Sequence, residues 1–135
     1  MLQSFAAKFT IITLLATGLL SMTPKPSTSL ICEFGTDYAI TNSTDRTDIM
    51  KVIFDGGCDY QDEDNIAPSG FQTGAVGFAT GVDITIKFAT APETGSIDIY
   101  NGTTYLITIS VIPSQLIYTY TASSPSSGLF LYYHY

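Results

Sequence analysis

The densest group of side chains that could bind an ion lies near the middle of the chain. It comprises Asp59, Asp62, Glu63, Asp64 and Asn65. Calcium prefers hard oxygen ligands, which carboxylate and amide groups supply. The spacing is not that of an EF-hand loop, because the fixed glycine and the closing glutamate are missing. We therefore predict an exposed acidic loop in which the four carboxylates are weak calcium candidates and no metal site is favoured.

Few residues suit catalysis. The single histidine, His134, lies between Tyr133 and Tyr135 in a strand-like run. There is no Gly-x-Ser-x-Gly motif for a serine nucleophile and no glycine-rich phosphate loop followed by Lys-Ser/Thr. A carboxylate pair for glycoside hydrolysis stays open, because such partners meet only in the folded chain. The sequence predicts a protein that is not an enzyme and has no cofactor.

Cys32 and Cys58 are the only cysteines. In an exported chain an even number of cysteines predicts a disulfide. It would close a loop of roughly 25 residues and contribute on the order of 3 kcal/mol to stability in the chain-entropy model. Two buried free thiols are the alternative. A zinc site lacks ligands, because one distant histidine cannot complete the set.

Two Asn-x-Thr sequons occur, at Asn42 and at Asn101. Such sequons are acceptors for N-glycosylation in exposed segments of secreted proteins. The first lies in a polar run over residues 41–48 that is typical of a surface loop. The second lies in a predicted hairpin turn. We expect at least one of them to carry a glycan if the host is eukaryotic.

Residues 81–135 contain the clearest strand pattern. Val82, Ile84 and Ile86 alternate with Asp83 and Thr85, which is the period of a strand with one buried face. Similar runs cover residues 97–100, 105–112, 116–121 and 129–135. Proline, glycine and serine separate these runs, and residues 101–102 (Asn-Gly) suit the centre of a type I′ hairpin turn.

Two further strands are predicted over residues 48–54 and 71–79, the second interrupted by Gly74 and Gly77. Several short strands at regular spacing indicate a sandwich or a barrel. We predict an all-β fold, an antiparallel β-sandwich of jelly-roll type.

The first residues are typical of a secretory signal. Lys8 precedes an apolar run over residues 9–20, which is short for a membrane span. Residues 1–29 are therefore assigned to a signal helix and a short lead, with cleavage between 18 and 29. An uncleaved anchor is the alternative. Residues 30–135 are then one secreted, extracellular domain without a stable membrane span.

The charge of this domain limits its partners. Loss of residues 1–29 removes Lys8 and Lys25, so twelve acidic residues face three cations and the net charge changes from −7 to −9. Such a field repels nucleic acid and other polyanions. We expect an extracellular protein or glycan as partner, and no nucleic acid.

Tyrosines gather near the C-terminus, at Tyr118, Tyr120, Tyr132, Tyr133 and Tyr135. Exposed, they would make an adhesive surface, because the ring is apolar and its tip is polar. Alternatively they cover the sheet and fill the core in a chain that lacks tryptophan. The second interpretation is favoured, because half-buried strand positions select aromatic residues.

Several segments together resemble a divergent CUB domain, a secreted β-sandwich module. These are Cys58-Asp59-Tyr60, residues 67–71 (Ala-Pro-Ser-Gly-Phe), residues 96–102 (Ser-Ile-Asp-Ile-Tyr-Asn-Gly) and residues 115–133, which resemble the family's closing hairpin. The separation of Cys32 from Cys58 is also close to that of the family's first disulfide. The family's second disulfide is absent, and Gly95 occupies the position of its calcium-binding aspartate.

The resemblance, together with the absence of catalytic motifs, implies a secreted, non-catalytic binding module. Small secreted proteins with CUB-like domains are abundant in nematodes, where many look like host-defence or surface proteins. We expect the ligand to be a protein or a glycan, contacted by sheet surfaces and by loops such as 101–104 and 123–128. The alternative is a structural subunit of an extracellular matrix, coat or filament, which low charge and exposed strand edges would suit.

Overall fold

Buried apolar and exposed polar side chains alternate along the strands of this chain. The computed structural model describes residues 32–44 and 49–135, and within them it contains nine strands and no helix. In β5 (Gly81–Phe88), Val82, Ile84 and Ile86 are buried whereas Asp83 and Lys87 are exposed, as a strand with one face in a core requires. The other strands are β1 Phe34–Asn42, β2 Met50–Asp55, β3 Tyr60–Ile66, β4 Phe71–Phe78, β6 Gly95–Asn101, β7 Thr104–Val111, β8 Ile117–Ser123 and β9 Leu129–His134.

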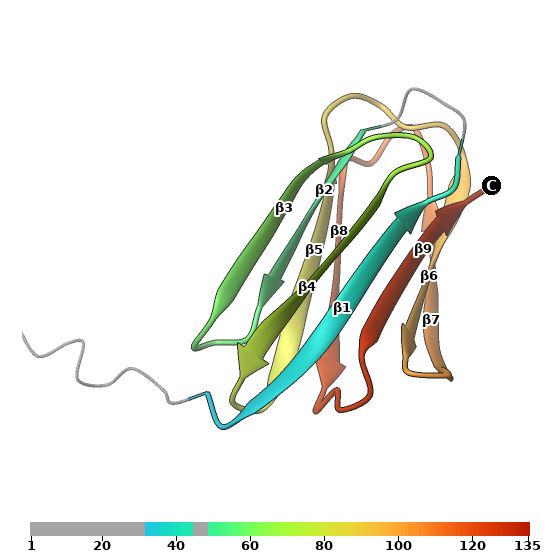
Figure 1. Ribbon diagram of the computed structural model, residues 1–135. Coiled ribbons are helices and arrows are strands. Elements are labelled where there is room, and N and C mark those ends of the chain that lie inside the picture. Colours follow the sequence, from blue (N-terminus) through green and yellow to red (C-terminus); the bar gives the residue numbers. More distant parts are fainter. Residues whose placement is uncertain (1–31, 45–48) are drawn as a thin grey trace, which may run out of the picture.

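The strands form two sheets that pack face to face (Figure 1). Sheet A has five strands in the order β4-β1-β9-β6-β7, and sheet B has four in the order β3-β2-β5-β8. Neighbouring strands are antiparallel except β1 and β9, which are parallel. The prediction of an all-β, mainly antiparallel sandwich is therefore confirmed.

The core lies between the sheets and joins them through aromatic contacts. Tyr38 of β1 stacks on Phe54 of β2, with ring centroids 4.1 Å apart. Phe88 of β5 contacts Tyr118 and Tyr133 edge-on. Both of those tyrosines are buried, so this part of the tyrosine cluster fills the core in a chain without tryptophan.

The strands predicted over 82–88, 97–100, 105–112, 116–121 and 129–135 correspond to β5 through β9. Those predicted over 48–54 and 71–79 correspond to β2 and β4. Two expectations were wrong. The acidic run expected as a loop is strand β3, and the polar run expected as a loop begins inside β1, because Thr41 and Asn42 belong to that strand.

The turn between β6 and β7 differs by one residue from the expected one. Asn101 pairs with Thr104, so Gly102 and Thr103 form the two-residue loop. Of this pair Gly102 alone has a positive φ, +63°, which is the pattern of a type II′ turn rather than type I′. The register then shifts by one residue beyond Tyr100, which bends the hairpin.

The predicted signal helix and its cleavage region, residues 1–29, lie outside the described residues. Within residues 32–44 and 49–135, no helix is long and apolar enough to cross a membrane.

Candidate binding face

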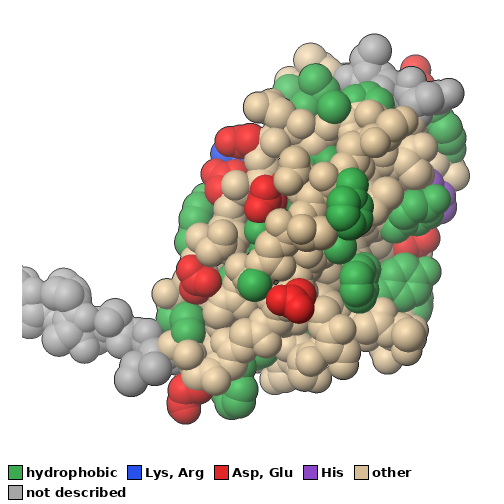
Figure 2. Space-filling model, in the orientation of Figure 1, with side chains coloured by type: hydrophobic (Ala, Val, Ile, Leu, Met, Phe, Trp, Pro, Cys, Tyr) green, Lys and Arg blue, Asp and Glu red, His purple; other side chains and the backbone are tan. Residues whose placement is uncertain are grey.

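The outer face of sheet A carries an aromatic surface. Phe71 of β4 and Phe130 of β9 are 61% and 44% exposed, and Tyr132 and Tyr105 are also exposed. Tyr100 of β6 lies opposite Phe130 and touches the ring of Tyr105. Figure 2 shows that hydrophobic side chains gather over β1 and β9, whereas Lys and Arg are nearly absent from this face.

A groove runs over this aromatic surface. Phe71 and Phe130 stand on either side of β1, with Ala39, Thr73 and Ala75 between them as small floor residues. Toward the start of β9 the groove continues into a second hollow of about 540 Å³, which shares Asp37, Ala75 and Phe130 with the first. We call the two hollows together the sheet A groove.

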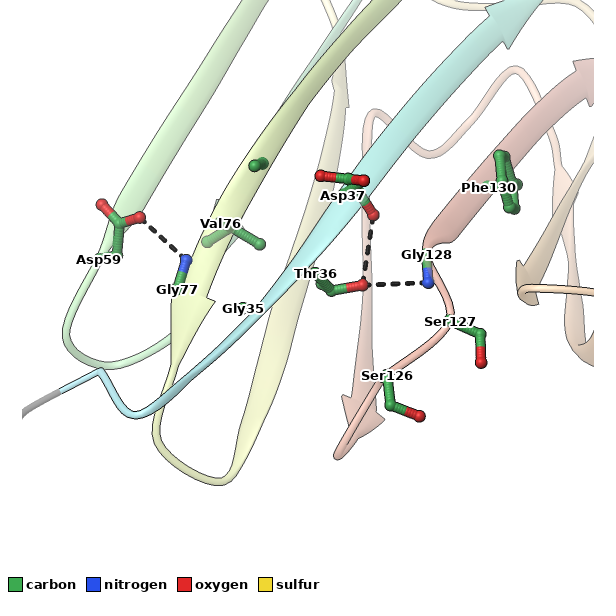
Figure 3. A pocket seen from close by; sticks show the side chains of 11 residues that line it. Gly35, Thr36, Asp37, Asp59, Val76, Gly77, Ser126, Ser127, Gly128 and Phe130 are labelled. Carbon is green, nitrogen blue, oxygen red and sulfur yellow. Dashed lines mark hydrogen bonds between the residues drawn. The ribbon is translucent and has the colours of Figure 1, made fainter.

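Polar groups line the second half of the sheet A groove (Figure 3). Asp37 lies on β1, and Ser126 and Ser127 lie on the loop that leads into β9. Among the residues described, none donates a hydrogen bond to the Asp37 carboxylate. This half of the groove therefore presents a carboxylate without a hydrogen-bond donor, beside the hydroxyl groups of two serines.

Hydrogen bonds hold the loop that carries these serines. The amide of Gly128, a residue at φ +99°, donates to Thr36 Oγ1 at 3.1 Å. The amide of Ser127 donates to Asn101 Oδ1 at 3.0 Å, and the amide of Gly102 donates to the carbonyl oxygen of Gly128 at 2.7 Å. The two loops expected as contact points, 101–104 and 123–128, are thus joined at one end of sheet A.

Asp59 closes the far end of the sheet A groove. Its carboxylate accepts hydrogen bonds from the amides of Gly77 and Tyr60, both at 2.9 Å, and from the Gln61 side chain. The Gly77 amide, followed by these other donors, lowers the pKa of Asp59 despite an opposing contribution from burial. Asp59 therefore stays ionised and fastens the β2–β3 turn to the edge of β4.

A polar network lies beside the aromatic surface, on β6, β7 and β9. Asp98 accepts from Thr108 Oγ1 at 2.5 Å and contacts His134 Nε2 at 2.8 Å, and Tyr105 donates to Thr108. The Thr108 hydroxyl, and then His134, lower the pKa of Asp98 against the effect of burial. His134 Nδ1 contacts the Tyr135 oxygen at 2.9 Å, so each ring nitrogen faces an oxygen atom.

Cationic side chains lie on the other sheet. Lys51 of β2 contacts Asp62 at 2.8 Å and Asp64 at 3.1 Å on the outer face of sheet B. Lys87 lies opposite Lys51 on β5. Within residues 32–44 and 49–135 these are the two Lys or Arg side chains, so the sheet A groove combines carboxylates with no neighbouring cation.

The predicted disulfide is confirmed. Cys32 and Cys58 are bonded, with their Cα atoms 5.7 Å apart. The bond joins the segment before β1 to the turn between β2 and β3, so it links the two sheets.

The two sequons occupy different environments. Asn42 is fully buried, its amide nitrogen donates to the carbonyl oxygen of Ile66 at 3.3 Å, and its Oδ1 accepts from Thr44. The expectation that Asn42 lies in an exposed loop is therefore wrong, and a glycan on this nitrogen does not fit the folded strand. Asn101 is half-buried beside the β6–β7 turn, where glycosylation stays a prediction.

The four calcium candidates do not converge. Asp62 and Asp64 face Lys51, Glu63 points to the opposite side of β3 and accepts from Tyr38, and Asp59 bonds to β4. No group of three His, Cys, Asp or Glu residues that could hold a metal ion occurs in the part of the chain that the structure describes.

The sequence prediction missed the groove residues on β1. Tyr38 and Ile40 alternate with Asp37, Ala39 and Thr41, a pattern that indicates a strand and could have placed Asp37 on its outer face. Phe71 and Phe130 lay in predicted strands, but only the pairing of β4, β1 and β9 brings them to one groove.

Comparison with protein-family models, curated proteins and solved structures finds no match to this chain. The resemblance to CUB domains therefore stays an expectation based on the segments quoted above. A function has to be inferred from the geometry of sheet A.

Proposed function

We propose that this chain is a secreted, non-catalytic binding module with a CUB-like jelly-roll fold, and that it recognises an extracellular protein or glycan through the outer face of sheet A. The observation that carries the proposal is the contrast between the two outer faces. Sheet A exposes Phe71, Phe130 and Tyr132, whereas sheet B exposes charged and hydroxyl side chains over most of its surface.

An exposed aromatic cluster supports a contact surface because it gives up the hydrophobic stabilisation that burial would supply. Tyrosine and phenylalanine offer large, rigid contact areas at a low cost in side-chain entropy. The Cys32–Cys58 disulfide is compatible with an oxidising, extracellular compartment. It supports the localisation that the signal-like residues 1–29 predict.

The test is a double variant, Phe130→Ala with Tyr132→Ala. The purified domain is screened against an array of glycans and an array of extracellular protein domains. Because two neighbouring contact residues are removed, we expect the double variant to lose at least about tenfold in affinity for any ligand that wild type binds.

Ile117→Ala serves as the matched control, because Ile117 is an apolar side chain exposed on sheet B. This control should bind like wild type. Equal binding by the double variant, or the absence of any ligand on both arrays, would contradict the proposal.

A further inference from the structure

We infer that the ligand of the sheet A groove is a neutral, hydroxyl-rich oligosaccharide. This inference rests on the proposed function, because it names the ligand class for the same face. It depends on three properties of the groove: two separated aromatic walls, an unpaired carboxylate beside serine hydroxyls, and the position of Lys51 and Lys87, the two cations of the described residues, on the other sheet.

The aromatic walls suit sugar rings. The face of an aromatic ring carries partial negative charge, so it attracts the weakly positive C–H groups on the flat side of a pyranose. Phe130 lies on β9 and Phe71 on β4, with β1 between them. Strands that are two positions apart lie roughly 10 Å from each other. A ligand that contacts both rings therefore extends over more than one sugar.

The floor of the groove admits a flat ligand. Ala39, Thr73 and Ala75 are the outward-facing side chains between the two rings, and Gly74 lies beside them. The largest of these floor side chains is that of threonine. A sugar ring stacked on Phe130 can therefore lie close to the backbone of β1 and β4.

The polar half of the sheet A groove offers hydrogen-bond partners for sugar hydroxyl groups. A carboxylate has two oxygens that only accept, so Asp37 can bind two neighbouring sugar hydroxyls at once. Ser126 and Ser127 line the same hollow and can both donate and accept. An apolar protein surface placed here would instead bury the Asp37 carboxylate without a partner, which is unfavourable.

Charge excludes acidic glycans. Lys51 and Lys87 lie on the outer face of sheet B, and the carboxylates of Asp37 and Asp59 line the groove. Sulfate or uronate groups would be repelled from this end of sheet A, and no cation of the described residues lies in the groove to pair with them.

The experiment is calorimetric titration of the folded domain with four hexasaccharides: cellohexaose, the β-1,4-linked N-acetylglucosamine hexamer, mannohexaose and a hyaluronan fragment. We expect at least one neutral hexasaccharide to bind and the hyaluronan fragment not to bind. Phe130→Ala and Asp37→Ala should each weaken binding at least about tenfold. The first removes a ring contact, and the second removes a charge-assisted pair of hydrogen bonds.

Three further variants act as controls. Phe130→Tyr keeps the ring and should retain binding. Ile117→Ala and Asp64→Ala alter sheet B and should bind within about twofold of wild type, since neither contacts the groove. Circular dichroism checks that each variant is folded, which the exposure of Phe130 and Asp37 favours.

Different failures have different meanings. If no neutral hexasaccharide binds but a protein domain binds through Phe130 and Tyr132, the inference is overturned and the proposed function stands. If neither glycans nor proteins bind, both are overturned. Tighter binding of hyaluronan, or neutral binding that survives Asp37→Ala and Phe130→Ala, also overturns the inference.

Discussion

At the scale of single residues, Gly74 of β4 leaves room for the ring of Tyr38, which reaches from sheet A to β3 of sheet B. A Cβ atom at this position would lie 2.3 Å from Tyr38 Oη and 2.5 Å from its Cζ. The Tyr38 ring cannot move away, because it stacks on Phe54 and its hydroxyl donates to Glu63 on β3. Burial, and then Glu63, raise the pKa of Tyr38, so its hydroxyl keeps the proton that it donates.

We predict that Gly74→Ala lowers the free energy of unfolding by about 1–3 kcal/mol, the usual effect of an overpacked core. Urea denaturation of wild type and variant measures the difference. Gly35→Ala is the matched control in the same sheet, because its added methyl group meets nothing closer than 3.8 Å. If Gly74→Ala were as stable as Gly35→Ala, the Tyr38 ring would not be packed tightly against β4.

A second prediction at this scale concerns Asp98. Its folded pKa is lowered, chiefly by the Thr108 hydroxyl and then by His134, so its contribution to stability is present above the unfolded pKa of aspartate, about 3.9. That contribution disappears as the pH falls through the lower folded pKa. We expect Asp98→Asn to cost about 1 kcal/mol near neutral pH and progressively less in acid.

Denaturation curves of wild type and Asp98→Asn, recorded from neutral to strongly acidic pH, test this expectation. Asp83→Asn is the control, because Asp83 also accepts from a threonine, Thr121, but has no histidine beside it. The control should show the smaller effect at neutral pH. A difference between wild type and Asp98→Asn that stays constant or grows in acid would contradict the assigned network.

At the scale of strands, β3 explains why an acidic run need not be a metal site. It is the edge strand of sheet B, and its side chains alternate between two environments. Asp62 and Asp64 pair with Lys51 on the outer face, and Glu63 points to the inner side toward Tyr38. Charged side chains on an edge strand also oppose the addition of a further strand from another molecule.

The contrast between strands shows what a sequence can predict here. Strand β5 was predictable because every inward position is apolar and every outward one is polar or small. Strand β3 was not, because its inward positions hold the polar residues Gln61 and Glu63, and the partner of Glu63 is Tyr38 on the distant strand β1. Local periodicity carries no information about such distant partners.

The candidate site was predictable only in part, for a related reason. The loops 101–104 and 123–128 were expected as contact points, and glycine, serine and proline marked them. The groove itself depends on β1 lying between β4 and β9, a parallel pairing of strands from opposite ends of the chain. No local pattern specifies that pairing, so Asp37, Phe71 and Phe130 could not be assigned to one site.

At the scale of the whole molecule, the disulfide supports the end of the sandwich where the polar half of the groove lies. A Cβ on Gly77, which lines the groove, would be 3.0 Å from Cys32 Sγ, so the bond packs against β4. Asp59 follows Cys58 in sequence, and its carboxylate accepts a hydrogen bond from the Gly77 amide. Covalent and polar links therefore act at the same place, between the β2–β3 turn and sheet A.

We predict that replacing both cysteines, Cys32→Ser with Cys58→Ser, lowers the free energy of unfolding by about 3 kcal/mol, because the unfolded chain regains the entropy of the loop between two residues with a sequence separation of 26. Wild type treated with a reductant should unfold like the double variant, and the reductant should leave the variant unchanged. Because β1, β4 and β9 keep their pairing, the folded variant should retain the aromatic half of the groove. A double variant as stable as oxidised wild type would show that the link between the sheets contributes little, and that the core alone holds them together.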